Sequence, residues 1–202
     1  NSRPDCSPSR WVIDFNDRSE AESAKFELPF ARALERVKPE RMKNNRAIRR
    51  ERWWQYGENA PGLRKAIADL SEAFAITRVS KTVMPVRVPT DQVFSDSLIA
   101  FASDAHSDQA VLSSSLHQLW AITYGSGMRN DPRYTPSDVF ETFPRPASTD
   151  ALDQIGRRLD EERRGIMIRR DLGLTKLYNL MNDPTVASTA DGDIARMRVI
   201  HR

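Results

Sequence analysis

Two prolines near residue 145 constrain the fold of this chain more than any other feature. Pro144 and Pro146 each hold their own φ at about −65° and push the preceding residue into an extended conformation. Residues 142–146 are therefore predicted to form an extended segment that neither a helix nor a central strand can absorb, and a charged helical pattern follows at once. We predict a domain edge here, with one domain over residues 1–146 and a helical spacer over residues 147–202.

The rest of the pattern predicts an α+β fold, with a mixed sheet, packed helices and a C-terminal helical spacer. Short apolar or β-branched runs predict strands at 11–15, 74–80 and 82–88, and a further strand region at 93–101. Apolar residues at helical spacing predict helices at 20–37, with a break at Pro29, and at 108–124 and 150–170. Further helices are predicted at 39–52, where Pro39 suits the first turn, and at 64–70, 174–181 and 193–202. Asp17 or Ser19 can cap the first helix, and Thr149 or Asp150 the long one after the domain edge.

Composition excludes several classes of protein. The chain is 39% hydrophobic and 29% charged, and no window approaches the roughly 18 consecutive apolar residues that a membrane span needs. Its single cysteine, Cys6, cannot form an internal disulfide, and the three histidines are too scattered for a zinc site. We therefore expect a cytoplasmic protein without a metal. Because the chain opens without methionine and closes inside a helical pattern, we also expect a fragment of a longer polypeptide.

Positive charge is concentrated in one stretch. Residues 38–52 hold seven basic residues against two acidic ones, whereas the net charge of the whole chain is only +3. A phosphate backbone is the commonest partner of such a patch, and the alternative is a solvated helix face. The predicted phosphate-binding residues are Lys43, Arg46, Arg49, Arg50 and, on a strand, Arg87. The aromatic residues at 53–56 follow directly and are predicted to belong to a core.

The sequence contains few features of an active site. It has no glycine-rich phosphate loop, no nucleophile elbow and no zincin-type His-Glu pair. His117 could act as a general base in a small stand-alone enzyme, but a lone histidine on an amphipathic helix is more often structural. Asp14, Glu22 and Lys25 resemble nuclease residues in type, but the last two lie in a helical context that would keep them from converging on a metal. We expect the chain itself to be non-catalytic.

Other polar residues suit the recognition of base pairs. Arg78, Ser80 and Lys81 lie on or between predicted strands, and Asp131 and Arg133 lie two apart on a predicted loop. An arginine can bind guanine O6 and N7 with two hydrogen bonds, and an aspartate can accept from cytosine N4. These five residues are the predicted base-reading set. The alternative for Asp131 and Arg133 is pairing with other side chains on the surface.

An ordered set of sequence blocks points to a family. It includes Trp-Val-Ile-Asp-Phe, Arg-Trp-Trp-Gln-Tyr, Ile-Thr-Arg-Val-Ser-Lys, Leu-His-Gln-Leu-Trp and Arg-Tyr-Thr-Pro-Ser-Asp-Val-Phe-Glu-Thr-Phe-Pro. The full set lies at 11–15, 29–30, 37–41, 52–56, 76–81, 93–96, 116–120, 133–144 and 174–179. Together these blocks resemble the target recognition domain and following helical segment of single-chain restriction-modification DNA methyltransferases. The group is the type IIL/IIG enzymes, which modify adenine N6.

The resemblance implies a division of labour in bacterial defence. In that family an upstream domain binds S-adenosylmethionine and carries an Asn-Pro-Pro-Tyr motif, and some members add an endonuclease. Here Asp131-Pro132 and Asp183-Pro184 lack the rest of that motif. The resemblance therefore implies a chain without a cofactor, which recognises double-stranded DNA for the methyltransferase domain of the same polypeptide. It also implies base-reading residues in the sheet-and-loop region and just before the Arg-Tyr-Thr block.

A different class of function stays open from the sequence alone. In this alternative the chain is a protein–protein interaction module, and the helix at 150–170 docks a partner together with the aromatic residues at 53–56. Charge reversal in the basic stretch separates the two hypotheses, because only DNA recognition depends on it.

Overall fold

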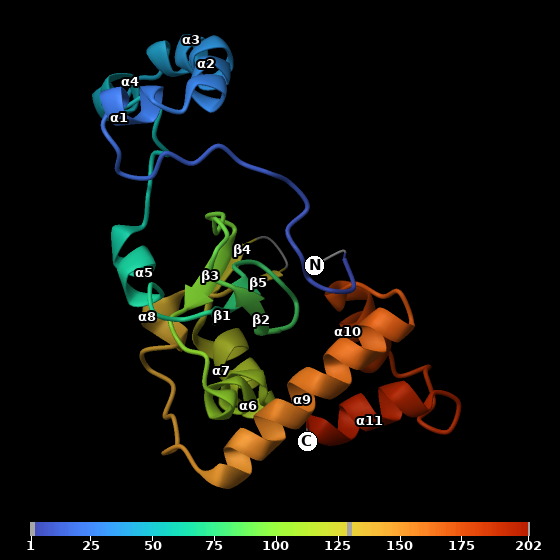
Figure 1. The fold of residues 1–202 in the computed structure, drawn as a ribbon. Helices are drawn as coiled ribbons and strands as arrows, with labels where there is room; N and C mark the ends of the chain where they lie inside the picture. Colours follow the sequence, from blue (N-terminus) through green and yellow to red (C-terminus); the bar gives the residue numbers. More distant parts are fainter. Residues whose placement is uncertain (1–2, 129–130, 202) are drawn as a thin grey trace. The chain divides into compact units, whose positions relative to one another are not determined.

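The computed structural model describes residues 3–128 and 131–201, and these divide into two compact units (Figure 1). We call Arg10–Lys65 the helical unit, and Asn1–Ser9 together with Ala66–Arg202 the sheet unit. Helices make up the ordered structure of the first, while the second combines helices with small antiparallel sheets. The α+β class predicted from the sequence is thereby confirmed.

Short helices surround an aromatic core in the helical unit. They are α1 (Glu20–Ala24), α2 (Glu27–Arg36), α3 (Lys38–Met42) and α4 (Ala47–Glu51). Ser19 begins α1, because its hydroxyl accepts from the Glu22 backbone N–H while the Glu22 carboxylate accepts from the Ser19 backbone N–H. Trp53 is buried, with its ring centroid 5.4 Å from that of Phe30. The predicted core role of the aromatic run is confirmed for Trp53.

The strand predicted at residues 11–15 is wrong. This segment is irregular, and none of the strand pairings among the described residues involves it. Trp11 is fully exposed, and Phe15 alone of the five residues is buried, in the aromatic core. A run of β-branched and aromatic residues forms a strand only where a neighbouring strand satisfies its backbone.

The single helix predicted over residues 39–52 is also wrong. The helix is interrupted between α3 and α4. There the Asn44 side chain accepts a hydrogen bond from the Arg46 backbone N–H at 3.0 Å and closes a local turn. The next helix, α5 (Pro61–Ala66), starts earlier than predicted. Its first residue is the proline, which suits the first turn of a helix.

A three-stranded antiparallel sheet occupies the middle of the sheet unit. Its strands are β1 (Glu72–Thr77), β2 (Val86–Pro89) and β3 (Leu98–Phe101), in the order β2-β1-β3. Successive residues of the central strand alternate between two hydrophobic clusters, since Ala75 faces one while Phe74 and Ile76 face the other. Both faces of β1 are therefore covered. The predicted strands at 74–80 and 82–88 correspond to β1 and β2, which are shorter.

Three helices close the Phe74 face. They are α6 (His106–Ser113), α7 (Ser115–Tyr124) and the short α8 (Pro136–Val139). The single helix predicted over 108–124 is wrong, because Ser114 interrupts it with an extended backbone. The Ser114 hydroxyl accepts from the His117 backbone N–H at 3.2 Å, so that α7 begins as a separate, capped helix.

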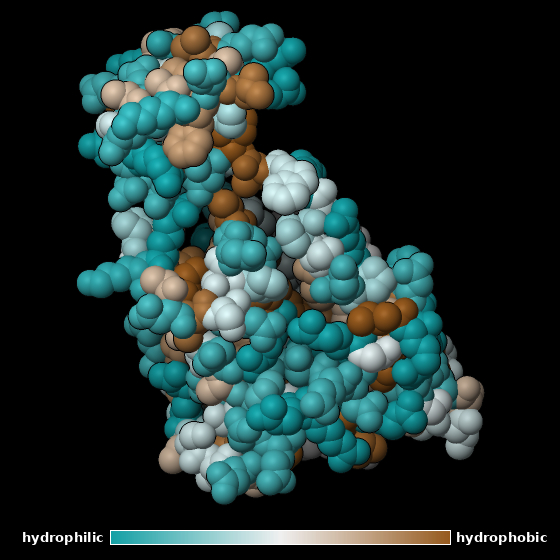
Figure 2. Space-filling view, in the orientation of Figure 1, coloured by the Kyte–Doolittle hydropathy of each residue, from teal (hydrophilic) through white to brown (hydrophobic). Residues whose placement is uncertain are grey.

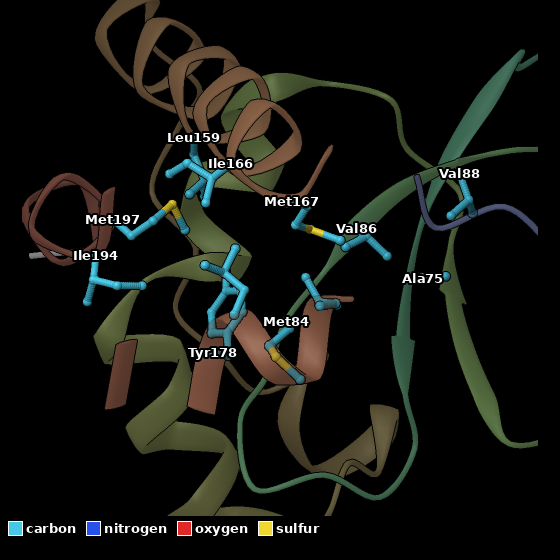
Figure 3. Close-up of a cluster of buried hydrophobic side chains, with 12 residues drawn as sticks. Ala75, Met84, Val86, Val88, Leu159, Ile166, Met167, Tyr178, Ile194 and Met197 are labelled. Carbon is cyan, nitrogen blue, oxygen red and sulfur yellow. The ribbon is translucent and has the colours of Figure 1, made fainter. Parts of the chain in front are cut away.

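The C-terminal helices cover the Ala75 face. They are α9 (Asp150–Arg169), α10 (Leu174–Asn182) and α11 (Gly192–Ile200). Figure 3 shows Ile166 and Met167 of α9, Tyr178 of α10 and Met197 of α11 gathered in one cluster with Val86 of β2. Residue 146, where we predict a domain boundary, lies inside the sheet unit. The helices beyond it share a core with the sheet.

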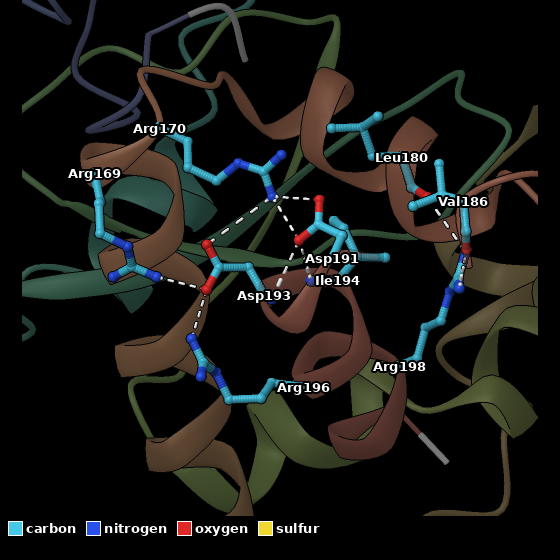
Figure 4. A network of polar contacts seen from close by, with 9 residues as sticks. All are labelled: Arg169, Arg170, Leu180, Val186, Asp191, Asp193, Ile194, Arg196 and Arg198. Carbon is cyan, nitrogen blue, oxygen red and sulfur yellow. Dashed lines mark hydrogen bonds and ion pairs between the residues drawn. The ribbon is translucent and has the colours of Figure 1, made fainter. Parts of the chain in front are cut away.

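An arginine–aspartate network joins the start of α11 to the end of α9 (Figure 4). Asp191 accepts from the backbone N–H groups of Asp193 and Ile194, and it also pairs with Arg170 Nη1 at 2.9 Å. Arg169 Nη2 lies 2.8 Å from Asp193. Carboxylates at a helix N-terminus are favoured by the helix dipole as well as by these cations. The network therefore stabilises α11 in place over the core.

Most of the surface that Figure 2 draws is hydrophilic. On the face drawn in Figure 2, hydrophobic side chains form small separate patches. The exposed apolar residues of α7 include Leu116 and Leu119, with 70% and 61% of their surfaces accessible. Over residues 3–128 and 131–201, no helix is both long enough and apolar enough to span a membrane.

A chain of hydrogen bonds runs from Arg163 through Tyr178 and His201 to Ser113. Arg163 Nη1 donates to the Tyr178 hydroxyl at 3.3 Å, and this hydroxyl donates to His201 Nε2 at 3.0 Å. His201 Nδ1 donates in turn to the Ser113 carbonyl oxygen at 3.1 Å, which assigns the neutral tautomer. Burial, together with the positive charge of Arg163, lowers the pKa of His201 from its ordinary 6.5 to about 4.

We expect this histidine to make the protein less stable in mild acid. Because its pKa is lower in the folded protein than in the unfolded chain, the unfolded chain takes up the proton first as pH falls from 6.5 towards 4. Between about pH 7 and about pH 5, this should lower the free energy of unfolding by about 2 kcal/mol.

Urea unfolding at the two pH values measures this loss, and the substitution His201→Gln provides the comparison. The variant should show a smaller pH dependence, with a remainder from His117, whose pKa is also lowered by burial. The same pH dependence in both proteins would contradict the role given to His201.

Candidate nucleic-acid interface

A β-hairpin follows directly on α7, where the sequence predicts a loop. Its strands are β4 (Ser126–Met128) and β5 (Asp131–Arg133), paired antiparallel with Ser126 opposite Arg133. Gly125 is needed at the junction, because a Cβ there would lie 2.3 Å from the Ala121 carbonyl oxygen and 3.0 Å from that of Arg133. The hairpin is thus held close to the end of α7.

The free edge of β5 pairs with residues 78–80, which continue the chain beyond β1. The contacts are the hydrogen bonds from Ser80 N–H to the Pro132 oxygen (3.2 Å) and from Tyr134 N–H to the Arg78 oxygen (2.8 Å), and the bridge between Val79 and Arg133. The structure therefore brings together two groups of predicted base-reading residues that lie about fifty positions apart in the sequence.

The register divides these side chains between two faces. Residues opposite each other in an antiparallel pair point to the same side, and successive residues alternate. Arg133 therefore points to the side of Val79, and Asp131 points with it. Arg78 and Ser80 point to the other side, where they line a small hollow against α7. We call the face that carries Asp131 and Arg133 the reading face.

Lys81 is exposed at the start of the loop that follows residues 78–80. Gln118 of α7 forms hydrogen bonds with the backbone of this loop. The Gln118 Oε1 accepts from the Val83 backbone N–H at 2.5 Å, and its Nε2 donates to the Lys81 carbonyl oxygen at 3.1 Å. One amide therefore fixes both ends of residues 81–83. This role could not be read from the sequence, because the partners of Gln118 lie 35 and 37 positions away.

Arg87, a predicted phosphate ligand, points into the sheet unit. Only 9% of its side chain is accessible, and it pairs with Glu72 at 3.3 Å. Its Nη2 donates to the Asp104 carbonyl oxygen at 2.6 Å and to His106 Nδ1 at 2.9 Å. The guanidinium thus joins β2 to the start of α6. We assign it this structural role and do not retain it as a phosphate ligand.

The other predicted phosphate ligands lie together in the helical unit. We call this group the basic surface: Lys43 directly after α3, Arg46 directly before α4, and Arg49 and Arg50 on α4. Lys43 and Arg46 are exposed. Arg50 Nη1 donates to the Asn44 carbonyl oxygen at 2.6 Å, which braces the turn between the two helices. The turn therefore gathers four cations over eight residues.

The histidine considered as a general base is a structural residue. His117 is fully buried, with Nδ1 2.7 Å from the Leu112 carbonyl oxygen and Nε2 3.1 Å from the Tyr134 hydroxyl. Burial lowers the pKa of His117 and raises that of Tyr134, so both groups are held neutral. Neither can exchange protons with a substrate from this position.

The residues considered for a nuclease do not converge. The Asp14 carboxylate pairs with Arg64 at 2.7 Å, while the Glu22 carboxylate belongs to the cap of α1. Within the part of the chain that the structure describes, no three His, Cys, Asp or Glu side chains form a group that could hold a metal ion.

Comparison with known proteins extends this description. The family model described as MmeI, target recognition domain, matches residues 7–147. Among solved structures, the chain is similar to the type IIL restriction-modification enzyme MmeI in complex with DNA, with a TM-score of 0.57 and 14% identity over 92% of this chain. The match spans 24% of the MmeI chain, so the likeness concerns the fold of about a quarter of that protein. No curated protein sequence matches the chain.

Proposed function

Because the chain belongs to the family of MmeI target recognition domains, we propose that it reads base sequence in double-stranded DNA for a methyltransferase domain of the same polypeptide. The family predicted from the ordered sequence blocks is confirmed. On this proposal S-adenosylmethionine, methyl transfer to adenine N6 and any cleavage of DNA belong to another part of that polypeptide. The family match favours DNA recognition over the protein-docking alternative.

The reading face is the observation that carries this proposal. The major groove of B-DNA admits a two-stranded β-ribbon, and β4 and β5 form such a ribbon. Asp131 and Arg133 stand two residues apart on one side of β5, a separation of about 7 Å that is close to two base-pair steps of about 3.4 Å each. Arginine can bind guanine and aspartate can bind cytosine, so the two residues can discriminate between base pairs.

The remaining predicted residues take supporting roles in this proposal. Lys81 is exposed on the loop beside the reading face and is positioned by Gln118, so we retain it as a base or phosphate contact. Arg78 and Ser80 brace the hairpin from behind, through the backbone hydrogen bonds of their segment. The basic surface supplies contacts to the phosphate backbone, which position the protein without reading sequence.

The test is the salt dependence of duplex binding by the full product of the gene. Each phosphate contact should add about 0.9 to the slope of the logarithm of affinity against the logarithm of salt concentration. The charge reversals Arg46→Glu and Arg50→Glu should therefore weaken binding to every duplex and flatten this slope by about one each. Binding of labelled duplexes at several salt concentrations measures both quantities.

Arg157→Glu is the matched control, because it changes the net charge equally on the exposed side of α9. It should leave affinity and slope nearly unchanged. The proposal fails if the full protein has no affinity for duplex DNA, or if all three reversals have the same effect.

A further inference from the structure

The helical unit contains a cavity that the roles assigned so far do not explain. Its volume is about 380 Å³, and it opens between the chain that precedes α1, the α3–α4 region and the segment before α5. This volume lies in the range typical of small-molecule sites. Four arginines line the cavity: Arg41, Arg49, Arg52 and Arg64.

The charge of the cavity is unbalanced. Arg64 is neutralised by Asp14 at 2.7 Å, and the other ion pair found among the described residues of this unit joins Arg36 to Glu35. Arg41, Arg49 and Arg52 thus have no carboxylate partner there, and Asp17 is the one acidic residue in the lining. The cavity therefore has an excess of positive charge, which attracts an anion.

Two buried polar atoms of the lining lack partners among the described residues. They are the donor Arg41 Nη1 and the acceptor Asn59 Oδ1. Leaving a buried polar group without a hydrogen bond is costly, and the cost is greater for a charged group. A ligand that offers both an anionic oxygen and a hydrogen-bond donor would satisfy both atoms. A phosphate attached to a nucleoside has this composition.

The backbone at Gly57 makes room for one of these arginines. A Cβ at this position would lie 2.7 Å from Arg49 Cζ and 2.8 Å from Arg49 Nη2. The Arg49 guanidinium thus lies directly against the backbone of a glycine at the cavity wall. An alanine at 57 would have to displace this guanidinium, and it would not change the charge of the protein.

We propose that this cavity is a binding site for a nucleoside phosphate, with Arg41, Arg49 and Arg52 as the ligands of the phosphate group. Guanidinium groups bind phosphate oxygens through paired, charge-assisted hydrogen bonds. The source that follows from the proposed function is a backbone phosphate of bound DNA, and to that extent the inference rests on that function. A free nucleotide would satisfy the same side chains.

Three variants and one small probe test the site. The probe is deoxythymidine 3′,5′-bisphosphate, which has a phosphate on each side of one nucleoside, as in a DNA strand. Its binding should shift the NMR signals of the Arg41, Arg49 and Arg52 Nε–H groups. The substitutions Arg49→Gln and Arg52→Gln should each weaken its binding about tenfold, as expected for the loss of one charge-assisted hydrogen bond.

Gly57→Ala tests the position of the Arg49 guanidinium separately from its charge. The added methyl group pushes the guanidinium away, so the affinity for the probe should fall although the net charge is unchanged. Arg36→Gln is the matched control. It removes an exposed arginine of the same unit that pairs with Glu35, and it should leave the affinity unchanged. Unaltered thermal unfolding of each variant would show that the fold is preserved.

Duplex binding by the same proteins identifies the source of the phosphate. Parallel losses for probe and duplex indicate the DNA backbone, whereas a loss for the probe alone indicates a free nucleotide. The site is disproved if the probe shifts none of the three arginine signals, or if Arg36→Gln weakens it as much as Arg52→Gln. Either result, with duplex binding and base preference intact, leaves the proposed function standing. Absence of duplex binding in every protein would count against that function instead.

Discussion

Replacing Gly156 with alanine should destabilise the sheet unit by about 3 kcal/mol, or prevent it from folding. Gly156 lies on α9 where this helix crosses α6. A Cβ there would be 1.8 Å from the His106 carbonyl oxygen and 2.6 Å from its carbonyl carbon. These are backbone atoms, so no change of rotamer can relieve the clash. A shift of α6 away from α9 is also opposed, because Arg87 forms hydrogen bonds with Asp104 and His106 at the start of α6.

Gly165 provides the control on the same helix. A Cβ there would meet nothing within 4 Å, so Gly165→Ala should stabilise α9 by up to about 1 kcal/mol through helix propensity alone. Urea unfolding of the 202-residue chain measures both variants. Opposite signs are expected at the two positions. If Gly156→Ala were neutral or stabilising, α9 and α6 could not be packed as described.

Replacing Arg133 with alanine should relax the choice of base pair at one position of the DNA target. If Arg133 binds guanine O6 and N7, its loss should reduce discrimination there by about 1–3 kcal/mol, or roughly 5- to 150-fold. Discrimination at positions read by other residues should persist. Asp131→Asn should alter the discrimination at a different base pair, up to two base-pair steps away, because the two side chains are about 7 Å apart along β5.

Affinities for a set of duplexes, varied one base pair at a time, measure this effect in the full product of the gene. Lys43→Ala is the comparison. Loss of an exposed lysine of the basic surface should lower the affinity for all duplexes by a similar factor. Uniform weakening by Arg133→Ala would make Arg133 a phosphate contact. The reading face would then lose its assigned role.

Local features of the sequence predicted the helices that begin at a capping residue. The capping box at Ser19 and the cap at Thr149 satisfy backbone N–H groups from within a few residues, so their effect does not depend on the rest of the fold. Residues 144–149 are irregular, as the prolines predict, whereas Thr142 and Phe143 form a turn after α8 where the sequence predicts an extended segment. The interruptions at Asn44 and Ser114 are not visible in the sequence, because each depends on one side-chain hydrogen bond to a backbone N–H.

Long-range pairing decided the features that the sequence could not. Residues 11–15 have the composition of a strand, but no neighbouring strand pairs with them in the described structure. Arg87 looks like a surface cation, yet three elements of the sheet unit enclose it. The arginines of the cavity were visible as charge, but their convergence with Asn59 depends on the packing of the helical unit.

The sequence by itself determined the family, the α+β class and the location of the positive charge, because these follow from residue types in order along the chain. Only the tertiary structure decided which side chains share a face. The register between residues 78–80 and β5 places Asp131 and Arg133 on one side and Arg78 and Ser80 on the other. In a pleated pair a shift of one residue would bring all four side chains to one face, and the backbone hydrogen bonds between these distant segments hold the observed register.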